Sequence, residues 1–235
     1  MDYGKLLLIP SSIDESAPEV IPEYILKALQ NIDLFFVEHE RSARRYLRSI
    51  GYDKEFNEVE LIRLDKDSTE VELQSIIDRL TSGKSGAVIS EAGLPCIADP
   101  GSRLVFHAQE KGINIQPFVG PSSLLMTLMA SGLNGQKFQF HGYLPIDKNE
   151  RKRAILQLES EVLKTGSTQI FIETPYRNNS LISDLLLYCN SNTYLCIGVG
   201  ITSTHESIKT RKIHQWKALN PQPGKVPAVF LLGSP

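Results

Sequence analysis

The stretch from Ala87 to Val119 reads A-V-I-S-E-A-G-L-P-C-I-A-D-P-G-S-R-L-V-F-H-A-Q-E-K-G-I-N-I-Q-P-F-V, and its pattern decides the fold class. The apolar runs Ala87–Ser90 and Ile113–Val119 predict two strands. Between them, a loop rich in glycine, proline and small polar residues, Ser90–Gly101, leads into a helix that ends near Lys111. Strand, loop, helix and strand in this order are typical of parallel α/β architecture.

The same alternation extends toward the N-terminus. The strands expected there are Leu6–Ile9, Leu34–Val37 and Val59–Leu64. Two helices are expected at Ile21–Ala28 and Ser42–Ile50. A third begins at the capping box Thr69-x-x-Glu72 and ends at Gly83. We therefore expect an N-terminal α/β domain, residues 1–119, with a mostly parallel sheet.

The second half of the chain has a different pattern of strands and helices. Its expected strands are Phe138–Tyr143, Ile170–Glu173, Tyr194–Val199, Ile213–Trp216 and Val229–Leu232. Its expected helices are Ser122–Ser131, a helix capped by Asn149 with Ile155, Leu158 and Val162 on one face, and Asn179–Cys189. The last two strands lie close together without a helix between them, which predicts a mixed sheet. We expect a C-terminal α/β domain, residues 120–235, with the hinge near Val119–Pro121.

Composition and charge exclude several classes of protein. Hydrophobic residues make up 41% and charged residues 22%, as in globular proteins, and no apolar run approaches the ~18 residues that cross a membrane. The run Leu6–Ile9 is too short for a secretory signal, so we expect a cytoplasmic protein without a membrane partner. Cys96, Cys189 and Cys196 form no C-x-x-C pair, and the histidines lack metal-binding spacing, so we expect no metal.

The formal net charge of −2 gives no support to a nucleic-acid partner. A local basic patch remains open as an alternative to solvated helix faces. Its candidate members are Lys148–Arg153, Arg41, Arg44, Arg45 and Arg48.

Three loops suit close approach of backbone to a ligand, because glycine lacks a Cβ and proline fixes turns. They are Ser90–Gly101, Gly120–Ser123 and Glu173–Arg177. Since ligands of α/β proteins bind outside the carboxyl ends of strands, these loops predict a ligand cleft between the domains. The sequence has no G-x-G-x-x-G after the first strand, no Walker A motif and no G-x-S-x-G, so dinucleotide, nucleotide-hydrolase and α/β-hydrolase chemistry lack their usual marks.

These segments resemble the motifs of the ribosomal RNA small subunit methyltransferase I family, a branch of the tetrapyrrole methylase superfamily. S-E-A-G-L-P-C-I-A-D-P-G-S-R-L-V at 90–105 is similar to S-D-A-G-T-P-G-I-S-D-P-G-Y-R-L-V of that family, and G-P-S-S at 120–123 to G-P-S-A. S-G-L-N-G-Q-K-F-Q-F-H-G-Y-L-P at 131–145, E-T-P-Y-R at 173–177 and the pair His205-Glu206 follow in the family's order. The resemblance spans nearly the whole chain.

The resemblance implies two α/β domains, a homodimer, and S-adenosylmethionine bound in the cleft between the domains without a metal. By motif position, the implied cofactor-binding residues are Pro10, Ser11, Glu91, Gly93, Leu94, Ser122, Ser123, Ile172, Glu173, Pro227 and Ala228. The implied reaction is methylation of a cytidine ribose 2′-hydroxyl in small-subunit ribosomal RNA. In-line positioning of the acceptor does most of the work in such a transfer, and no catalytic base is identified.

Some segments depart from the family pattern. The first loop, Pro10–Glu15, lacks the family's Gly-Asn, and Val37–Arg41 keeps Glu38 and Arg41 but changes the centre. Val199, Gly200 and Ser203 stand where the family has Arg, Glu and Lys. These departures leave two alternatives open: methylation of a tetrapyrrole or another small molecule, and a cofactor-binding or dimeric interaction protein that has lost catalysis.

Overall fold

The computed structural model describes residues 3–235 and divides into two compact units, Met1–Ser122 and Ser123–Pro235. Both units are α/β, with a five-stranded sheet in each, so the predicted fold class is confirmed. The domain boundary after residue 119 stays a prediction. Within residues 3–235, no helix combines the length and the apolar character that crossing a membrane requires.

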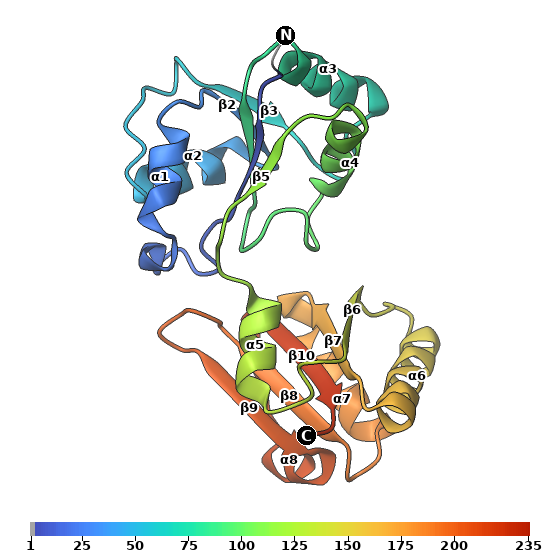
Figure 1. The fold of residues 1–235 in the computed structure, drawn as a ribbon. Coiled ribbons are helices and arrows are strands. Elements are labelled where there is room, and N and C mark those ends of the chain that lie inside the picture. Colours follow the sequence, from blue (N-terminus) through green and yellow to red (C-terminus); the bar gives the residue numbers. More distant parts are fainter. Residues whose placement is uncertain (1–2) are drawn as a thin grey trace. The chain divides into compact units, whose positions relative to one another are not determined.

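The N-terminal unit is a parallel sheet with helices on both faces (Figure 1). Its strand order is β3-β2-β4-β1-β5, and every pairing is parallel. Its elements are β1 (Leu6–Ile9), η1 (Pro18–Val20), α1 (Glu23–Leu29), β2 (Leu34–Val37), α2 (Glu40–Ser49), β3 (Glu60–Arg63), α3 (Glu70–Thr81), β4 (Gly86–Ile89), α4 (Ser102–Glu110) and β5 (Ile115–Pro117).

Side chains along each strand point alternately to the two faces of this sheet, so a hydrophobic core forms on each face. Phe35 of β2 packs with α1 and α2, whereas its neighbour Phe36 packs with α3 and α4. The predicted capping box begins α3, since the Thr69 hydroxyl accepts from the Glu72 N–H and the Glu72 carboxylate accepts from the Thr69 N–H.

The topology creates a switch point at the carboxyl ends of β1 and β4. These two strands are neighbours, but β1 leads to α1 on one face of the sheet and β4 leads to α4 on the other. The chain segments that leave the two strands therefore diverge, which is the arrangement that opens a ligand crevice in α/β sheets.

The C-terminal unit holds the mixed sheet, with order β6-β7-β10-β8-β9. Only β6 and β7 are parallel, and the other three pairings are antiparallel. Helices α6, α7 and α8 pack on one face, and α5 packs on the other. The elements are α5 (Ser123–Ser131), β6 (Phe138–Tyr143), α6 (Lys148–Thr165), β7 (Thr168–Glu173), η2 (Pro175–Arg177), α7 (Asn178–Tyr188), β8 (Tyr194–Val199), β9 (Ser207–Lys212), α8 (Ile213–Leu219) and β10 (Ala228–Gly233).

The strand predicted at Ile213–Trp216 is wrong, because these residues begin α8. Ile213 and Trp216 are both buried and lie three positions apart, a helical spacing that is hard to recognise in so short a segment. The missing strand is β9, whose sequence S-I-K-T-R-K is too polar to stand out. The prediction of a mixed sheet is confirmed, but the strand β9, which pairs with β8, lies earlier in the chain than the predicted one.

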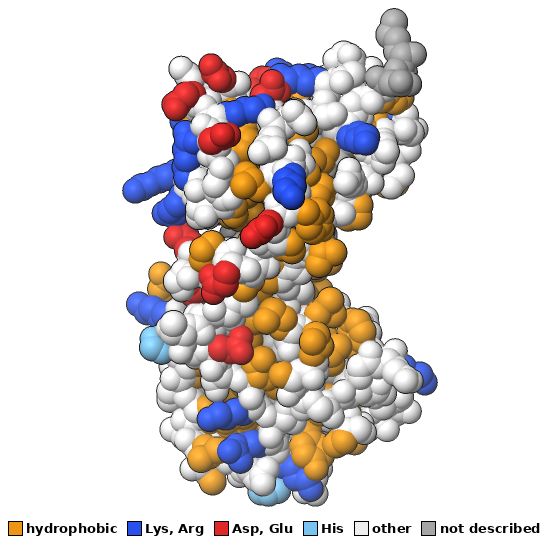
Figure 2. Space-filling model, turned by 60° about the vertical axis from the view of Figure 1, so that its left-hand side comes forward, with side chains coloured by type: hydrophobic (Ala, Val, Ile, Leu, Met, Phe, Trp, Pro, Cys, Tyr) orange, Lys and Arg blue, Asp and Glu red, His pale blue; other side chains and the backbone are white. Residues whose placement is uncertain are grey.

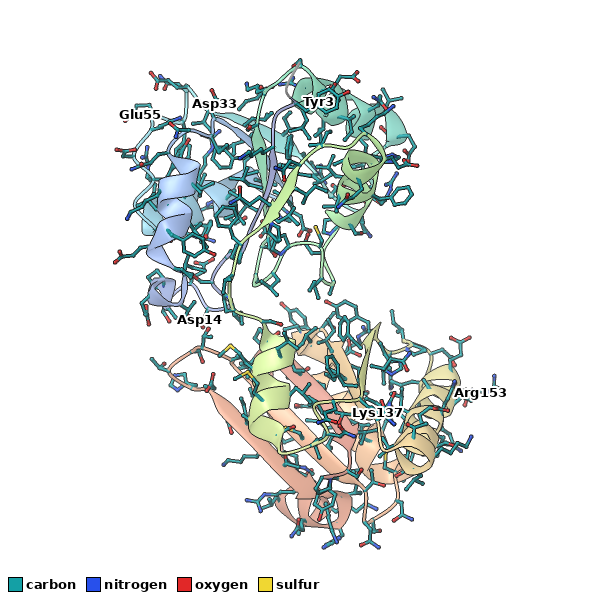
Figure 3. All side chains as sticks on the ribbon, in the orientation of Figure 1. Tyr3, Asp14, Asp33, Glu55, Lys137 and Arg153 are labelled. Carbon is teal, nitrogen blue, oxygen red and sulfur yellow. The ribbon has the colours of Figure 1, made fainter. Side chains whose placement is uncertain are left out.

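The start of α6 also differs from the prediction. Asp147, not Asn149, is the N-cap, since its carboxylate accepts from the N–H groups of Asn149 and Glu150. One residue of the expected basic run, Arg151, turns inward and pairs with Asp184 on α7 at 2.5 Å, with both side chains 7% exposed. Arg153 points outward from α6 (Figure 3).

We predict that Asp184→Ala lowers the free energy of unfolding by about 3–5 kcal/mol, because it leaves the Arg151 guanidinium buried without its anion. Urea denaturation measures this loss. The matched control is Arg44→Ala, which removes an exposed pair with Glu40 and should cost about 1 kcal/mol or less. Equal losses in the two variants would contradict the burial of the Arg151 charge.

Candidate functional site

Two backbone hydrogen bonds join the loops that follow β1 and β4. The Ser11 N–H donates to the Gly93 carbonyl at 2.9 Å, and the Gly93 N–H donates to the Ser11 carbonyl at 3.1 Å. Two of the predicted cofactor residues are thus held side by side at the switch point. The loop after β4 is thereby fixed to its neighbour rather than left to move in solvent.

The segment after β5 packs against the same two loops. A Cβ at Gly120 would lie 2.2 Å from Pro10 Cβ, and one at Gly93 would lie 3.2 Å from the Pro121 carbonyl oxygen. Gly93 also has φ +78°, a conformation that favours glycine. The structure therefore brings together Pro10, Ser11, Gly93 and the start of the predicted 120–123 loop, at a spacing that only glycine permits.

Asp99 organises the rest of the loop after β4. One carboxylate oxygen accepts from the Cys96 and Gly101 N–H groups at 3.1 and 3.2 Å, and the other accepts from the Ser90 hydroxyl at 2.9 Å. Cys96 and Ala98 adopt φ values of +67° and +57°, which non-glycine residues rarely do. The loop is therefore a strained segment held by its own aspartate, as is common beside ligand sites.

A cavity of about 110 Å³ that contains several serine side chains opens beside this crevice, within the N-terminal unit. Three segments line it: the loop after β1, helix α2 and the loop after β4. Its residues are Ser11, Ser12, Glu15, Ser42, Ala43, Arg45, Tyr46, Ser49, Ser90 and Glu91. Only Ser11 and Glu91 were predicted site residues. Ser90 belongs to a predicted ligand loop and Arg45 to the suggested basic patch. The others were missed, although Ser42, Tyr46 and Ser49 share one face of the predicted helix and carry hydroxyl groups.

Glu91 faces α2. Its carboxylate accepts from the Ser42 hydroxyl at 2.6 Å and lies 3.6 Å from His39 Nδ1. Glu38 directly follows β2. Burial raises the pKa of Glu38, and the nearby Asp99 and Glu91 carboxylates raise it further. The carboxyl edge of this sheet is therefore acidic.

The predicted cofactor residues of the C-terminal unit also form one group. Antiparallel pairing of β7 and β10 sets Glu173 opposite Ala228, and Ile172 opposite Val229. The Pro227 carbonyl accepts from the Gly200 N–H at 3.0 Å. Ile172, Glu173, Pro227 and Ala228 are thus neighbours, and their role in binding a cofactor stays a prediction.

Glu173 is the charged member of this group and is 4% exposed. Its Oε1 accepts from Arg177 at 2.5 Å and from the Thr174 N–H at 2.6 Å. Its Oε2 is buried and, among residues 3–235, has no hydrogen-bond partner. A buried carboxylate oxygen without a donor is costly, so it marks a place where a ligand N–H or O–H can bind.

The remaining predicted pair, Ser122 and Ser123, lies where the chain passes from one unit to the other, and Ser123 begins α5. The altered segment that follows β8 forms a tight turn. Gly200 has φ +58°, and its Cβ would lie 2.8 Å from Ser203 Oγ, so the side chain that the family pattern places there would strain this turn.

Two further sequence hypotheses concern charge and metals. Several members of the suggested basic patch have partners: Arg44 pairs with Glu40, Arg45 pairs with Glu15, and Arg48 stacks over Phe56. Across the described part of the chain, no group of three or more His, Cys, Asp or Glu residues is placed to hold a metal ion.

The sequence of this chain matches a known protein family and several of its named members. The family model of the tetrapyrrole (corrin/porphyrin) methylases matches residues 16–215. Ribosomal RNA small subunit methyltransferase I of Thermotoga maritima is 32% identical over 183 residues, which cover 78% of this chain and 77% of that protein. The protein of the same name from Halalkalibacterium halodurans is 31% identical over 205 residues, which cover 87% and 67%.

Solved structures show the same fold. A diphthine synthase structure superposes with a TM-score of 0.69 at 16% identity, covering 97% of this chain and 89% of that one. The methyltransferase CobJ superposes with a TM-score of 0.64 at 13% identity, covering 100% and 95%.

We predict that Glu38→Gln stabilises the protein at about pH 8 and loses this advantage at about pH 4. The pKa of Glu38 lies above its ordinary value of 4.5, so its neutral form is favoured by folding. The stability that this group contributes is present below 4.5 and is lost as the pH rises through the folded-state pKa. Thermal unfolding across this range measures the effect, with exposed Glu58→Gln as the control for one lost charge. A constant difference between Glu38→Gln and wild type would contradict the prediction.

Proposed function

Since this chain belongs to the tetrapyrrole (corrin/porphyrin) methylases and is a methyltransferase, we propose that S-adenosylmethionine is its methyl donor and a cytidine ribose 2′-hydroxyl of small-subunit ribosomal RNA its acceptor. The observation that carries this proposal is the identity of about 30% to proteins named ribosomal RNA small subunit methyltransferase I, which extends over both units. The fold neighbours support the methyltransferase fold alone.

The residues present fit the cofactor. Gly93 and Gly120 let backbone approach closely in the N-terminal unit, and the unpartnered Glu173 Oε2 in the C-terminal unit can accept from an amino group or a sugar hydroxyl. We propose that these residues hold S-adenosylmethionine together with their predicted neighbours. Pro10, Ser11, Glu91 and Leu94 are those of the N-terminal unit, and Ser122, Ser123, Ile172, Pro227 and Ala228 complete the set.

When bound, the cofactor supplies a methyl group that its sulfonium already activates. The protein's share is then to bind the acceptor, orient its hydroxyl and keep water away. The rigid loop after β4, fixed by Asp99 and by the Ser11–Gly93 hydrogen bonds, suits orientation because it needs no rearrangement when a ligand arrives.

The distribution of charge supports an RNA acceptor better than the net charge does. The C-terminal unit has 12 Lys and Arg against 7 Asp and Glu, a formal charge of +5, whereas the N-terminal unit has 13 against 20, or −7. On the face shown in Figure 2, most acidic side chains belong to the N-terminal unit. A net charge of −2 therefore conceals a basic unit, and local charge is what phosphates meet.

The basic residues of β9 and α8 are the best candidates for phosphate contacts. Within residues 3–235, none of them lies within salt-bridge distance of a carboxylate, and two of them stack over Tyr194 and Trp216. They are Lys209, Arg211, Lys212 and Lys217. Aromatic supports hold cationic side chains outward without neutralising them.

Two other expectations become proposals here. The chain acts as a homodimer, which the exposed apolar side chains Leu125 and Met129 on α5 support, at 44% and 83% exposure. It works in the cytoplasm, because the proposed acceptor belongs to the ribosome.

We predict that Gly93→Val lowers the affinity for S-adenosylhomocysteine at least about tenfold, because the branched side chain meets the Pro121 carbonyl and strains the loop. Titration calorimetry measures the affinity. Gly112→Val is the matched control, since Gly112 has φ +70° but open space around it, so it should lose stability and keep affinity. No heat with wild-type protein would refute the cofactor.

We predict that the wild-type protein transfers labelled methyl groups from S-adenosylmethionine to small ribosomal subunits that lack this modification. Mass spectrometry should locate the label on a cytidine ribose. The reaction should slow steeply with added salt, and the double variant Lys209→Glu, Lys212→Glu should slow it at least about tenfold. The double variant Lys27→Glu, Lys111→Glu changes the same charge on the N-terminal unit and should leave the rate nearly unchanged.

Cofactor binding without methyl transfer to these subunits would sink the RNA acceptor. Small acceptors such as tetrapyrroles would then be tested with the same cofactor-loaded protein. Equal effects of the two double variants would instead show that the basic unit does not contact RNA.

A further inference from the structure

The cavity beside α2 contains a polar atom that the protein leaves unsatisfied. Ser11 is 3% exposed, and its Oγ is buried without a hydrogen-bond partner among residues 3–235. An unsatisfied buried hydroxyl destabilises a folded protein unless a ligand or water completes it. Ser11 lines the cavity, so that is where the missing partner would bind.

The opposite wall is a helix face of hydroxyl groups. Ser42, Tyr46 and Ser49 follow one another at helical spacing on α2, with the small Ala43 between them. Ser90 and Glu91 close the cavity from the loop after β4, and the Glu91 carboxylate is already oriented by Ser42 at 2.6 Å. The hydroxyls of Ser42, Tyr46, Ser49 and Ser90 already donate within the protein, so the walls offer their oxygens as acceptors, together with the unpartnered Ser11 hydroxyl and one fixed carboxylate.

Ser11 Oγ and the Glu91 carboxylate together select a neutral ligand with a hydroxyl group, which can accept from the first and donate to the second. Glu15 and Glu91 disfavour a bare anion in the interior. The volume of about 110 Å³ is well below that of a site for a complete cofactor, so it suits a single sugar ring. Arg45 stands on the same wall, exposed at the rim and bridged to Glu15 at 2.5 Å, where it can meet a phosphate beside the sugar.

We propose that this cavity binds one ribose, with its adjoining phosphate on Arg45, from the RNA substrate. The assignment rests on the proposed function and adds a place where the RNA is held. The 2′-hydroxyl of the sugar would accept from Ser11 Oγ and donate to the Glu91 carboxylate, while the phosphate would compete with Glu15 for Arg45. In this assignment the side chains of Ser11 and Glu91 meet the RNA, and their part in the proposed cofactor site is limited to their backbone. The ribose of the cofactor is the competing occupant, and the experiment separates the two sources.

The decisive variant is Ser11→Ala, because the proposal predicts that it keeps or raises stability but weakens RNA binding. Removing an unsatisfied hydroxyl should keep or raise the melting temperature, whereas the dissociation constant for a short RNA of the acceptor sequence should rise about threefold to tenfold. The matched control is Ser131→Ala. Ser131 is also buried, but its hydroxyl donates to the Leu128 carbonyl at 2.7 Å and accepts from the Leu133 N–H at 3.0 Å, so this variant should lose stability and keep RNA affinity.

Two more variants test the sugar and the phosphate separately. Ser49→Leu blocks the cavity from an exposed helix position, so it should weaken RNA binding without unfolding the protein. Arg45→Gln should reduce the slope of log affinity against log salt by about one. A DNA oligonucleotide of the same sequence should bind wild type more weakly and should be insensitive to Ser11→Ala, because it lacks the 2′-hydroxyl.

Each contrary result has a definite meaning. If Ser11→Ala and Ser49→Leu weaken S-adenosylhomocysteine binding and leave RNA binding intact, the ribose belongs to the cofactor and the RNA assignment is overturned. If neither variant changes either ligand while wild type still methylates RNA, the cavity is not a ribose site and the proposed function stands. If wild type neither binds nor methylates RNA, both proposals fail.

Discussion

The pair of backbone hydrogen bonds between Ser11 and Gly93 is the contact on which the candidate site depends. β1 and β4 are parallel neighbours whose helices lie on opposite faces of the sheet, so their loops would separate if nothing joined them. The bridge holds the two loops together just beyond the strands and requires a left-handed residue at 93. It also places Ser11 against the cavity and directs the loop after β4 toward Pro121. A short contact between main-chain atoms thus sets the position of side chains from three segments.

Much of the fold follows from local patterns. β1, β2 and β8 begin and end where the apolar runs do, because buried strands leave a clear apolar pattern. The error at Ile213–Trp216 has a physical cause. Four residues cannot distinguish a strand from one turn of helix, and the true strand, β9, lies at the sheet edge, where one side needs no apolar neighbour. Likewise, Arg151 is hydrophilic in sequence and buried in the structure, since its partner Asp184 lies 33 positions away.

The candidate site also has parts that could be found from the sequence and parts that could not. Residues in glycine-rich and proline-rich loops could be found from sequence, because backbone approach restricts which residues fit, as at Gly93. The hydroxyl wall of α2 could not, because serine is common on exposed helices and nothing local marks Ser42 as a neighbour of Glu91, 49 positions later. Unsatisfied atoms such as Glu173 Oε2 are visible only once every donor has a position. The uneven distribution of Lys, Arg, Asp and Glu supports an RNA partner only after the chain is divided into its two units.

The basic edge strand has a consequence for how the molecule behaves at high concentration. β9 is the last strand of its sheet, so its outer N–H and C=O groups are a template on which a strand of another molecule can add. Lys209 and Arg211 alternate with Lys212 along this edge, so cations project from both faces of the sheet. A second copy that approached edge to edge would bring like charges together at once. The same side chains that suit a polyanion thus discourage self-association into continuous sheets, and neutralising them risks aggregation.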